Sequence, residues 1–289
     1  MQRPDSRHPP LPLPLPLTRR RLMGAALGSG FAAAVLPVGA QTIRTDSAGL
    51  TVGEVLIAVG DFRMPAYRAM PEGRTHLPVV LVVSEIFGVH EHIADVARRF
   101  ARLGYLAIAP ELFERQGDAQ SYGEIAKLWS EVVAKASDAQ VLGDLDATVA
   151  WATANGGDTS RLGITGFCWG GRITWMFAAH SRAVKAGVAW YGSLARAPFP
   201  GDKTALEVAA QIKAPMLGLY GAADEGIPND TVEAMRAALK AAGNTRSRIV
   251  SYPDTPHAFH ADYRPSYRKA AADDGWKRCI GWFKANGVV

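Results

Sequence analysis

Apolar and polar residues follow two periods along this chain, and the two periods alternate from residue 51 to the end. Two opening runs, Val52 to Val59 and Phe62 to Ala69, predict an antiparallel pair of strands. The run Leu77 to Val83 is continuously apolar, which is typical of a strand buried on both faces. A helical period from Ile93 to Leu103 then ends at Gly104, a residue that favours helix termination.

The same alternation continues through the rest of the chain. A long helical region from about Tyr122 to Ala154 contains a predicted break near Ser137. The later predicted strands are Tyr105 to Ala109, Arg161 to Thr165, Ala186 to Tyr191, Pro215 to Tyr220 and Ser247 to Tyr252. Three later helices are also predicted: one begins at Arg172, a second runs from about Asp230 to Ala242, and a third runs from about Tyr267 to Ala285. Strands that alternate with helices indicate a mostly parallel sheet with right-handed crossovers. We therefore predict one doubly wound α/β domain over residues 41–289.

Composition agrees with an enzyme-sized globular domain, because 48% of the 289 residues are hydrophobic. The net charge of +5 does not indicate a nucleic-acid partner. Residues 1–40 contain five arginines against one aspartate, so the remaining chain is close to neutral.

The first forty residues predict an export signal. Thr18-Arg19-Arg20-Arg21-Leu22-Met23 resembles the twin-arginine pattern, and the weakly hydrophobic stretch Gly24 to Leu36 follows it. Val38-Gly39-Ala40 supplies the small residues that a signal peptidase reads, so we place the mature start at Gln41. We expect transient contact with the twin-arginine export machinery and a periplasmic or secreted protein, with no stable membrane span because the apolar stretch is shorter than the ~20 residues that a span needs. A basic arm with a chance apolar run is the alternative.

The segment Ile164-Thr-Gly-Phe-Cys168-Trp-Gly-Gly-Arg172 has the pattern of a nucleophile elbow, with cysteine where serine is usual. The glycines allow a sharp strand-to-helix turn that leaves no room for a Cβ atom. This turn places the sulfur of Cys168 at a helix N-terminus, where the helix dipole favours thiolate. Cys168 is thus a candidate covalent catalyst, although a buried cysteine in a glycine-rich turn is the simpler alternative.

A base and an acid for this nucleophile occur in the order that α/β-hydrolases use, nucleophile, acid, then histidine. Asp224 follows the strand Pro215 to Tyr220, and His257 follows the strand that ends at Tyr252. The carboxyl ends of parallel strands meet at one edge of a sheet, so we expect Cys168, Asp224 and His257 to form a triad there. Glu225 competes with Asp224, which would otherwise serve as a turn residue.

His257 also has a rival in His260, three residues further along the chain. Glu85 is a fourth candidate, because it directly follows the buried strand Leu77 to Val83. There it would accept the thiol's proton or hold the side chain aside, unless it merely caps the next helix. The same loop predicts an oxyanion hole made by the backbone N–H groups of Ile86 and Trp169.

Taken together, these motifs resemble the dienelactone hydrolase (carboxymethylenebutenolidase) family from roughly Val52 to Trp282. The shared segments include Pro65-Ala66-Tyr67, Glu85-Ile-Phe-Gly88, Gly104-Tyr105, Pro110-Glu-Leu-Phe113, Lys127-Leu-Trp129, Gly166-Phe-Cys168-Trp-Gly-Gly171, Trp190-Tyr-Gly192, Gly221 with Asp224, and His257-Ala-Phe259. The resemblance implies the Cys168, Asp224 and His257 triad, with Glu85 contacting the resting thiol until substrate displaces it. It also implies the Trp169 and Ile86 amides as the oxyanion hole.

The chain departs from that family where substrate is bound. The resemblance implies two arginines that clamp a substrate carboxylate, but this chain has Tyr122 and Ala261 at the corresponding positions. Arg264 is close enough in sequence to substitute, and we expect Tyr122, Trp129 and Arg264 near the substrate.

We therefore expect a hydrolase of small-molecule esters or enol lactones that uses a thioester acyl-enzyme. We expect that the reaction requires no organic cofactor. We also expect no metal, since the histidine and aspartate residues lack the spacing of a zinc site. Two alternatives stay open: a thiol redox or peroxide-reactive protein, with Cys279 as the resolving cysteine, and a non-catalytic ligand-binding protein. Cys279 lies in a predicted amphipathic helix, and we interpret it as structural.

Overall fold

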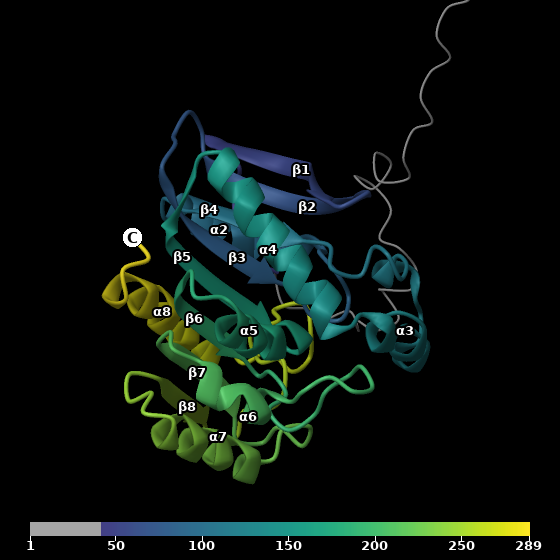
Figure 1. Ribbon diagram of the computed structural model, residues 1–289, viewed down its shortest axis with the longest axis vertical. Coiled ribbons are helices and arrows are strands. Elements are labelled where there is room, and N and C mark those ends of the chain that lie inside the picture. The colour runs from purple at the N-terminus through teal and green to yellow at the C-terminus, as the bar shows by residue number, and fades with distance from the viewer. Residues whose placement is uncertain (1–41) are drawn as a thin grey trace, which may run out of the picture.

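An eight-stranded sheet spans the computed structural model, which describes residues 42–289 (Figure 1). The strand order is β1-β2-β4-β3-β5-β6-β7-β8; β2 is antiparallel to both β1 and β4, and the other neighbouring strands are parallel. The strands are β1 (Leu50–Val59), β2 (Phe62–Pro71), β3 (Leu77–Val83), β4 (Leu106–Pro110), β5 (Gly157–Phe167), β6 (Val184–Trp190), β7 (Met216–Gly221) and β8 (Arg248–Tyr252). The doubly wound, mostly parallel fold predicted from the periodicity is confirmed.

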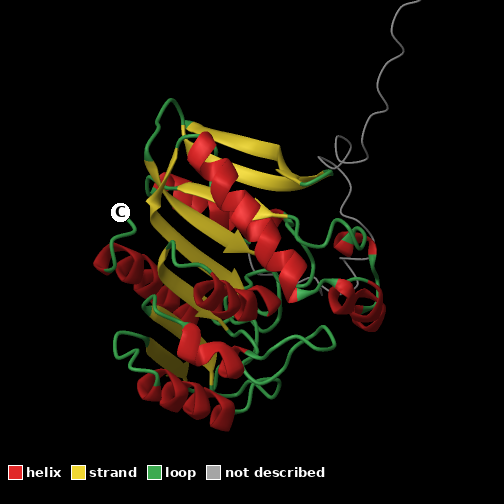
Figure 2. Cartoon of the chain, in the orientation of Figure 1, coloured by secondary structure: helices red, strands yellow, loops and turns green. Residues whose placement is uncertain are grey.

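Helices cover both faces of this sheet, as Figure 2 shows. They are α2 (Glu91–Arg102), α3 (Ile125–Glu131), α4 (Asp138–Ala154), α5 (Trp169–His180), α6 (Ala205–Val208), α7 (Asn229–Ala241) and α8 (Lys269–Ala285), with 3₁₀ turns at Ala119–Ser121, Val133–Lys135 and Ala209–Gln211. On one face α2 packs against α8, where the Phe100 ring lies 4.8 Å from the Trp276 ring between centroids. Helices α4 and α5 lie on the other face, in front of the sheet in Figure 1.

Local sequence explains the element boundaries nearest the site. Every residue of β3 is buried, as its unbroken apolar run predicts. The predicted break near Ser137 is confirmed, because the Ser137 side chain accepts a hydrogen bond from the Gln140 backbone N–H and begins α4.

The four candidate catalytic residues follow the carboxyl ends of four parallel strands. Cys168 directly follows β5, Glu85 follows β3, Asp224 follows β7 and His257 follows β8. Since these strands are parallel, their ends meet at one edge of the sheet, where sites in such folds form.

The first described residues lie against the folded body. The Ile43 backbone N–H donates to the Asp262 carboxylate at 2.8 Å, and the Thr45 N–H donates to Asp95. Arg98 Nε in turn donates to the Thr45 carbonyl at 3.0 Å. Residues 43–45 are therefore held to the domain by hydrogen bonds on the side of α2, although most of their surface is exposed.

The predicted leader, residues 1–40, lies outside the described residues. Across residues 42–289, no helix combines the length and the apolar character needed to cross a membrane.

Candidate active site

Cys168 occupies the sharp turn between β5 and α5. Its backbone has φ 54° and ψ −115°, which is unusual for a residue with a side chain, and its N–H donates to the Trp190 carbonyl at 3.0 Å. A Cβ atom on Gly166 would collide with the backbone of Gly170, and one on Gly170 would collide with the Val83 carbonyl. The steric role predicted for these two glycines is therefore confirmed.

The sulfur lies at the first turn of α5 and is only partly buried. The backbone N–H of Trp169, the first helical residue, is among the amides that have no partner within a helix. The Ile86 loop lies beside this turn, because a Cβ on Gly170 would also contact the Ser84 carbonyl. The loop that carries Ile86 therefore approaches the turn that carries Cys168, and the oxyanion hole formed by the Ile86 and Trp169 amides stays a prediction.

His257 and Asp224 form a close pair. His257 Nδ1 lies 2.6 Å from Asp224 Oδ2, and Asp224 Oδ1 accepts the Gly226 backbone N–H at 2.9 Å. Asp224 is only 5% exposed. The rivals are placed elsewhere: Glu225 is exposed, and His260 is buried with its ring stacked on Phe167.

The His257 imidazole also interacts with Cys168, which changes its pKa. Burial lowers the pKa of His257, but the negative charge on Cys168, the hydrogen bond to Asp224 and the bond to Cys168 outweigh it and raise the pKa to about 10. At neutral pH the imidazole is therefore protonated beside the sulfur. This arrangement places an imidazolium between Cys168 and the Asp224 carboxylate.

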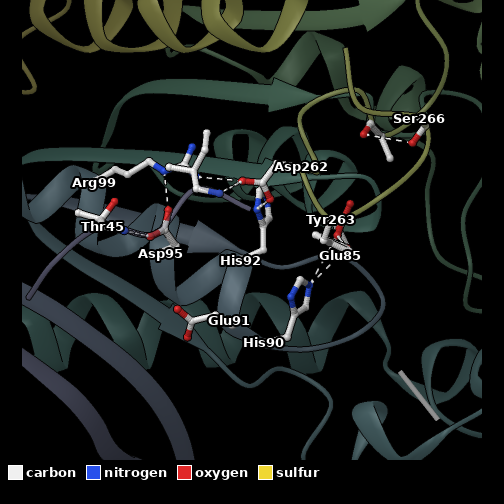
Figure 3. Close-up of polar contacts among 12 residues, drawn as sticks. Thr45, Glu85, His90, Glu91, His92, Asp95, Arg99, Asp262, Tyr263 and Ser266 are labelled. Carbon is white, nitrogen blue, oxygen red and sulfur yellow. Dashed lines mark hydrogen bonds and ion pairs between the residues drawn. The ribbon is translucent and has the colours of Figure 1, made fainter. Parts of the chain in front are cut away.

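Glu85 is buried among groups that favour its charged form (Figure 3). Tyr263 Oη donates to Glu85 Oε2, and His90 Nε2 lies 3.7 Å from the same oxygen. Burial raises the pKa of Glu85, but the hydrogen bond to His90 and the charges of His90, Arg264 and His92 lower it to about 2. Glu85 is therefore an ionised, enclosed carboxylate, and the alternative that it is an exposed helix cap is wrong.

The implied contact between Glu85 and the resting thiol is also absent. Among the described residues Glu85 Oε1 has no hydrogen-bond partner, while Oε2 is held by Tyr263. Cys168 instead interacts with His257. The physical reason is that an ionised carboxylate held by Tyr263 and His90 has no proton to share with a sulfur already paired with an imidazolium.

The low pKa of Glu85 predicts an acid-sensitive contribution to folding. Its folded pKa of about 2 lies below the ordinary value of 4.5, so its stabilisation is present above pH 4.5 and is lost as pH falls toward 2. Wild type should lose about 3 kcal/mol more unfolding free energy than Glu85→Gln across this window. Urea denaturation at a series of pH values measures it, with the exposed Glu124→Gln as control. Parallel curves for wild type and Glu85→Gln would contradict the prediction.

A cavity of about 770 Å³ opens over the triad. Its lining residues are Trp129, Cys168, Trp169, Arg172, Tyr191, Ser193, Arg196, Ala197, Pro198, Ala223, Asp224, Glu225, Gly226, Ile227, Pro256 and His257. Of the three residues expected near substrate, only Trp129 lines the cavity. Tyr122 is not among the lining residues, and the Arg264 guanidinium lies over the Phe87 ring, 5.8 Å from its centroid.

Sequence reasoning missed Tyr191, although the Trp190-Tyr-Gly192 motif contains it. Its ring meets that of His257 edge-on, 5.1 Å between centroids, and its backbone is held at φ 38°. Within the described chain its buried hydroxyl has no hydrogen-bond partner. Burial, with the charges of Glu85 and Cys168, raises the Tyr191 pKa well above its usual value, so the group stays a neutral donor facing the site.

No group of three or more histidine, cysteine, aspartate or glutamate side chains within residues 42–289 is arranged to hold a metal ion.

This domain is similar to proteins of a known family. The model of the dienelactone hydrolase family matches residues 64–287. The chain belongs to this family. As a dienelactone hydrolase family member, it is a hydrolase of the ester and lactone class.

Similar proteins come from several bacteria. The chain is 58% identical over 281 residues to a Methylorubrum extorquens protein named "Putative carboxymethylenebutenolidase", and the match covers 94% of each chain. It is 51% identical over 272 residues to an Escherichia coli K12 protein of the same name, covering 92% of this chain and 98% of that one. A crystal structure of a "Putative Dienelactone Hydrolase" from Klebsiella pneumoniae is similar at 54% identity with a TM-score of 0.79, covering 81% of this chain and 98% of that chain. These matches agree with the family motifs read from the sequence.

Proposed function

We propose that this protein hydrolyses a small-molecule ester or enol lactone through a Cys168, His257 and Asp224 triad and a thioester acyl-enzyme. One observation carries the proposal: the 2.6 Å contact between His257 and Asp224, in a cavity that Cys168 also lines at the first turn of α5. Family membership supports the reaction class.

Acylation begins from the thiolate–imidazolium pair. The sulfur of Cys168 forms a bond to the carbonyl carbon, and the carbonyl electron pair moves onto oxygen, facing the Trp169 and Ile86 amides. As the carbon–oxygen bond to the leaving group breaks, His257 gives its proton to that oxygen. In a lactone the leaving oxygen stays tethered to the acyl chain.

Deacylation uses the neutral imidazole that remains. Acylation removes the negative charge on sulfur, which is the main interaction that raises the His257 pKa, so the imidazole can now accept a proton. It takes one from water as the water oxygen attacks the thioester carbon, and the carbon–sulfur bond breaks. The acid product leaves, and the thiolate–imidazolium pair is restored.

This chemistry restricts the substrates. A thiolate is a good leaving group, so the tetrahedral adduct of a stable amide would expel sulfur rather than the amine. Activated esters, enol lactones and thioesters have leaving groups that compete with sulfur. No step requires a metal or an organic cofactor.

Trapping the intermediate tests the proposed function. Protein beginning at Gln41 is mixed with 4-nitrophenyl acetate under reducing conditions, quenched in acid and measured by intact and peptide mass spectrometry. We expect a burst of nitrophenol and one acetyl group on the peptide that contains Cys168. Turnover of the ester without acetylation of Cys168 would contradict the thioester route. Oxidation of Cys168 by peroxide in place of acetylation would favour the redox alternative.

The raised pKa of His257 predicts the alkaline limit of turnover. The imidazolium is the form that protonates the leaving group, and it persists below a pKa of about 10 and is lost above it. For an alkyl ester, kcat/KM should fall about tenfold per pH unit above pH 10, whereas an aryl ester with a stable leaving anion should fall much less. Equal losses on both esters, with activity that does not return at pH 8, would indicate unfolding instead.

We also propose export of the folded protein by the twin-arginine route, on the basis of residues 18–40. Replacing Arg19 and Arg20 together with lysine should shift the protein from the periplasmic fraction to the cytoplasm in unprocessed form. Immunoblots of cell fractions measure this, and unchanged processing of the double variant would contradict it.

A further inference from the structure

Glu85 is held by a side chain from a distant loop. The Tyr263 hydroxyl donates to Glu85 Oε2, and Tyr263 lies between β8 and α8, in the same loop as His257. Both side chains are buried, with 1% of Glu85 and 7% of Tyr263 exposed. Such a hydrogen bond fixes the carboxylate, because a buried oxygen that lost its donor would be left unsatisfied. Tyr263 therefore sets where the Glu85 carboxylate points.

Tyr263 is itself fixed by neighbours from the start of α2 (Figure 3). Its ring meets the His90 ring edge-on, 5.0 Å between centroids, and lies 5.3 Å from the His92 ring. His92 Nδ1 lies 2.9 Å from Asp262 Oδ1, on the residue directly before Tyr263. The start of α2 and the loop after β8 are thus tied together at the residue that holds Glu85.

The turn that carries Cys168 lies beside this carboxylate. A Cβ atom on Gly170 would lie 2.5 Å from the Ser84 carbonyl, so the residue before Glu85 contacts the first turn of α5. Glu85 Oε1 has no hydrogen-bond partner among residues 42–289. Without the Tyr263 hydroxyl, neither oxygen of the carboxylate would keep it turned from the sulfur.

A released Glu85 would act against the nucleophile in either protonation state. An ionised carboxylate near the sulfur repels a thiolate and disfavours its formation. A protonated carboxyl group donates a hydrogen bond to the sulfur instead. Both make the sulfur of Cys168 a weaker nucleophile, because the unencumbered thiolate is the reactive form.

The groups that face Glu85 come from three parts of the fold. Burial raises the pKa of Glu85, and the hydrogen bond to His90 and the nearby positive charges nevertheless lower it to about 2. The facing groups are His90 and His92 at the start of α2, Tyr263 and Arg264 after β8, and Tyr191 after β6. Glu85 is therefore charged at every pH at which the enzyme would be assayed.

We propose that Tyr263 is a positioning residue that holds the Glu85 carboxylate away from Cys168, so that the thiol is ready for attack before substrate binds. This inference rests on the proposed function of the same site. Activation of Cys168 then depends on His257 and Asp224, and substrate binding need not displace Glu85.

The pH dependence of Cys168 reactivity tests the proposal. Alkylation by iodoacetamide and kcat/KM on 4-nitrophenyl acetate are measured from about pH 5 to pH 9 for wild type, Tyr263→Phe, Glu85→Gln and the double variant. In Tyr263→Phe both rates should fall about tenfold below wild type at the acid end of this range and match wild type at the alkaline end. In the Glu85→Gln background the same change should alter neither rate by more than about twofold, because glutamine carries neither the charge nor the proton.

Tyr105→Phe is the matched control, because it removes another buried hydroxyl, which donates to the Val288 carbonyl at 3.0 Å, at the opposite end of the strands. It should keep the wild-type pH profile. A loss in Tyr263→Phe that is equal at every pH, or that persists in the Glu85→Gln background, would show a structural role and overturn the inference. Unchanged rates at every pH would also overturn it.

Glu85→Gln alone supplies a second test that does not need Tyr263→Phe to fold. If the carboxylate is held away from the sulfur, its replacement should move the pH of half-maximal alkylation by less than about half a unit. A carboxylate in contact with the sulfur would move it by about one unit or more, which would overturn the inference. If wild type hydrolysed no ester, the proposed function would fail, and the alkylation data would still decide where Glu85 lies.

Discussion

Cys168→Ala is expected to lower kcat/KM on an activated ester by about 10⁴-fold or more, to the level of the remaining binding site. The variant removes the atom that forms the acyl bond and leaves the rest of the turn in place. Cys168→Ser should be almost as inactive. A serine hydroxyl does not ionise beside an imidazolium, so it lacks the charge that holds the proton on His257. Initial rates of nitrophenol release, with protein folding checked by circular dichroism, measure both variants.

The other cysteine is the matched control for this prediction. Cys279 is fully buried on α8, and burial raises the pKa of its thiol well above the usual range. Cys279→Ala should therefore keep its activity per folded molecule, and iodoacetamide should label wild type at Cys168 only. Retention of activity in Cys168→Ala would refute the proposed mechanism. Loss of activity in the folded Cys279→Ala variant would favour a role for both thiols.

Asp224→Asn is expected to lower kcat by about 10² to 10⁴-fold with a small change in stability. The asparagine oxygen can still accept the Gly226 N–H, so the loop keeps its shape. Its amide group then points a donor at His257 Nδ1, which carries a proton in the native pair. The imidazole is left in the wrong tautomer and loses the charge that stabilises the imidazolium.

Glu225→Gln is the control for Asp224→Asn, because it removes the same charge from the adjacent, exposed position. On a neutral ester it should change kcat by less than about twofold. If the two variants lost activity equally, the net charge of the loop rather than the hydrogen bond to His257 would be responsible. The pH dependence of kcat separates these outcomes, since only Asp224→Asn should move its alkaline limit to lower pH.

Local patterns predict much of this fold because they depend on near neighbours in sequence. The bounds of β3 agree with its apolar run, and Ser137 begins α4 where the break was expected. The prediction placed the strand before Cys168 at Arg161 to Thr165, but β5 begins at Gly157. The polar residues at the start of β5 do not alternate with apolar ones, so the sequence did not indicate a strand there. In the structure these residues pair with β3 from Leu77 onward, and this pairing extends β5.

The places of Cys168, Asp224 and His257 after their strands were predictable, and the surroundings of the site were not. Motif spacing and strand order predicted that Cys168, Asp224 and His257 lie at one edge of the sheet, because each of them follows a predicted strand. The environment of Glu85 depends on Tyr263, which is 178 residues away in sequence, and no local pattern indicates such a contact. Arg172 and Arg196, which both line the cavity, were missed for the same reason, because only the folded chain brings them beside Cys168.

The contacts of residues 43–45 set a practical limit on how far the chain can be shortened. Asp262 accepts the Ile43 N–H and also holds His92 at 2.9 Å, and it directly precedes Tyr263, which binds Glu85 (Figure 3). Recombinant protein that began at β1 would leave Asp262 and Asp95 without these backbone donors. Its loss of activity would then be mistaken for a defect of the catalytic residues. Preparations for kinetic work should therefore start no later than Thr42.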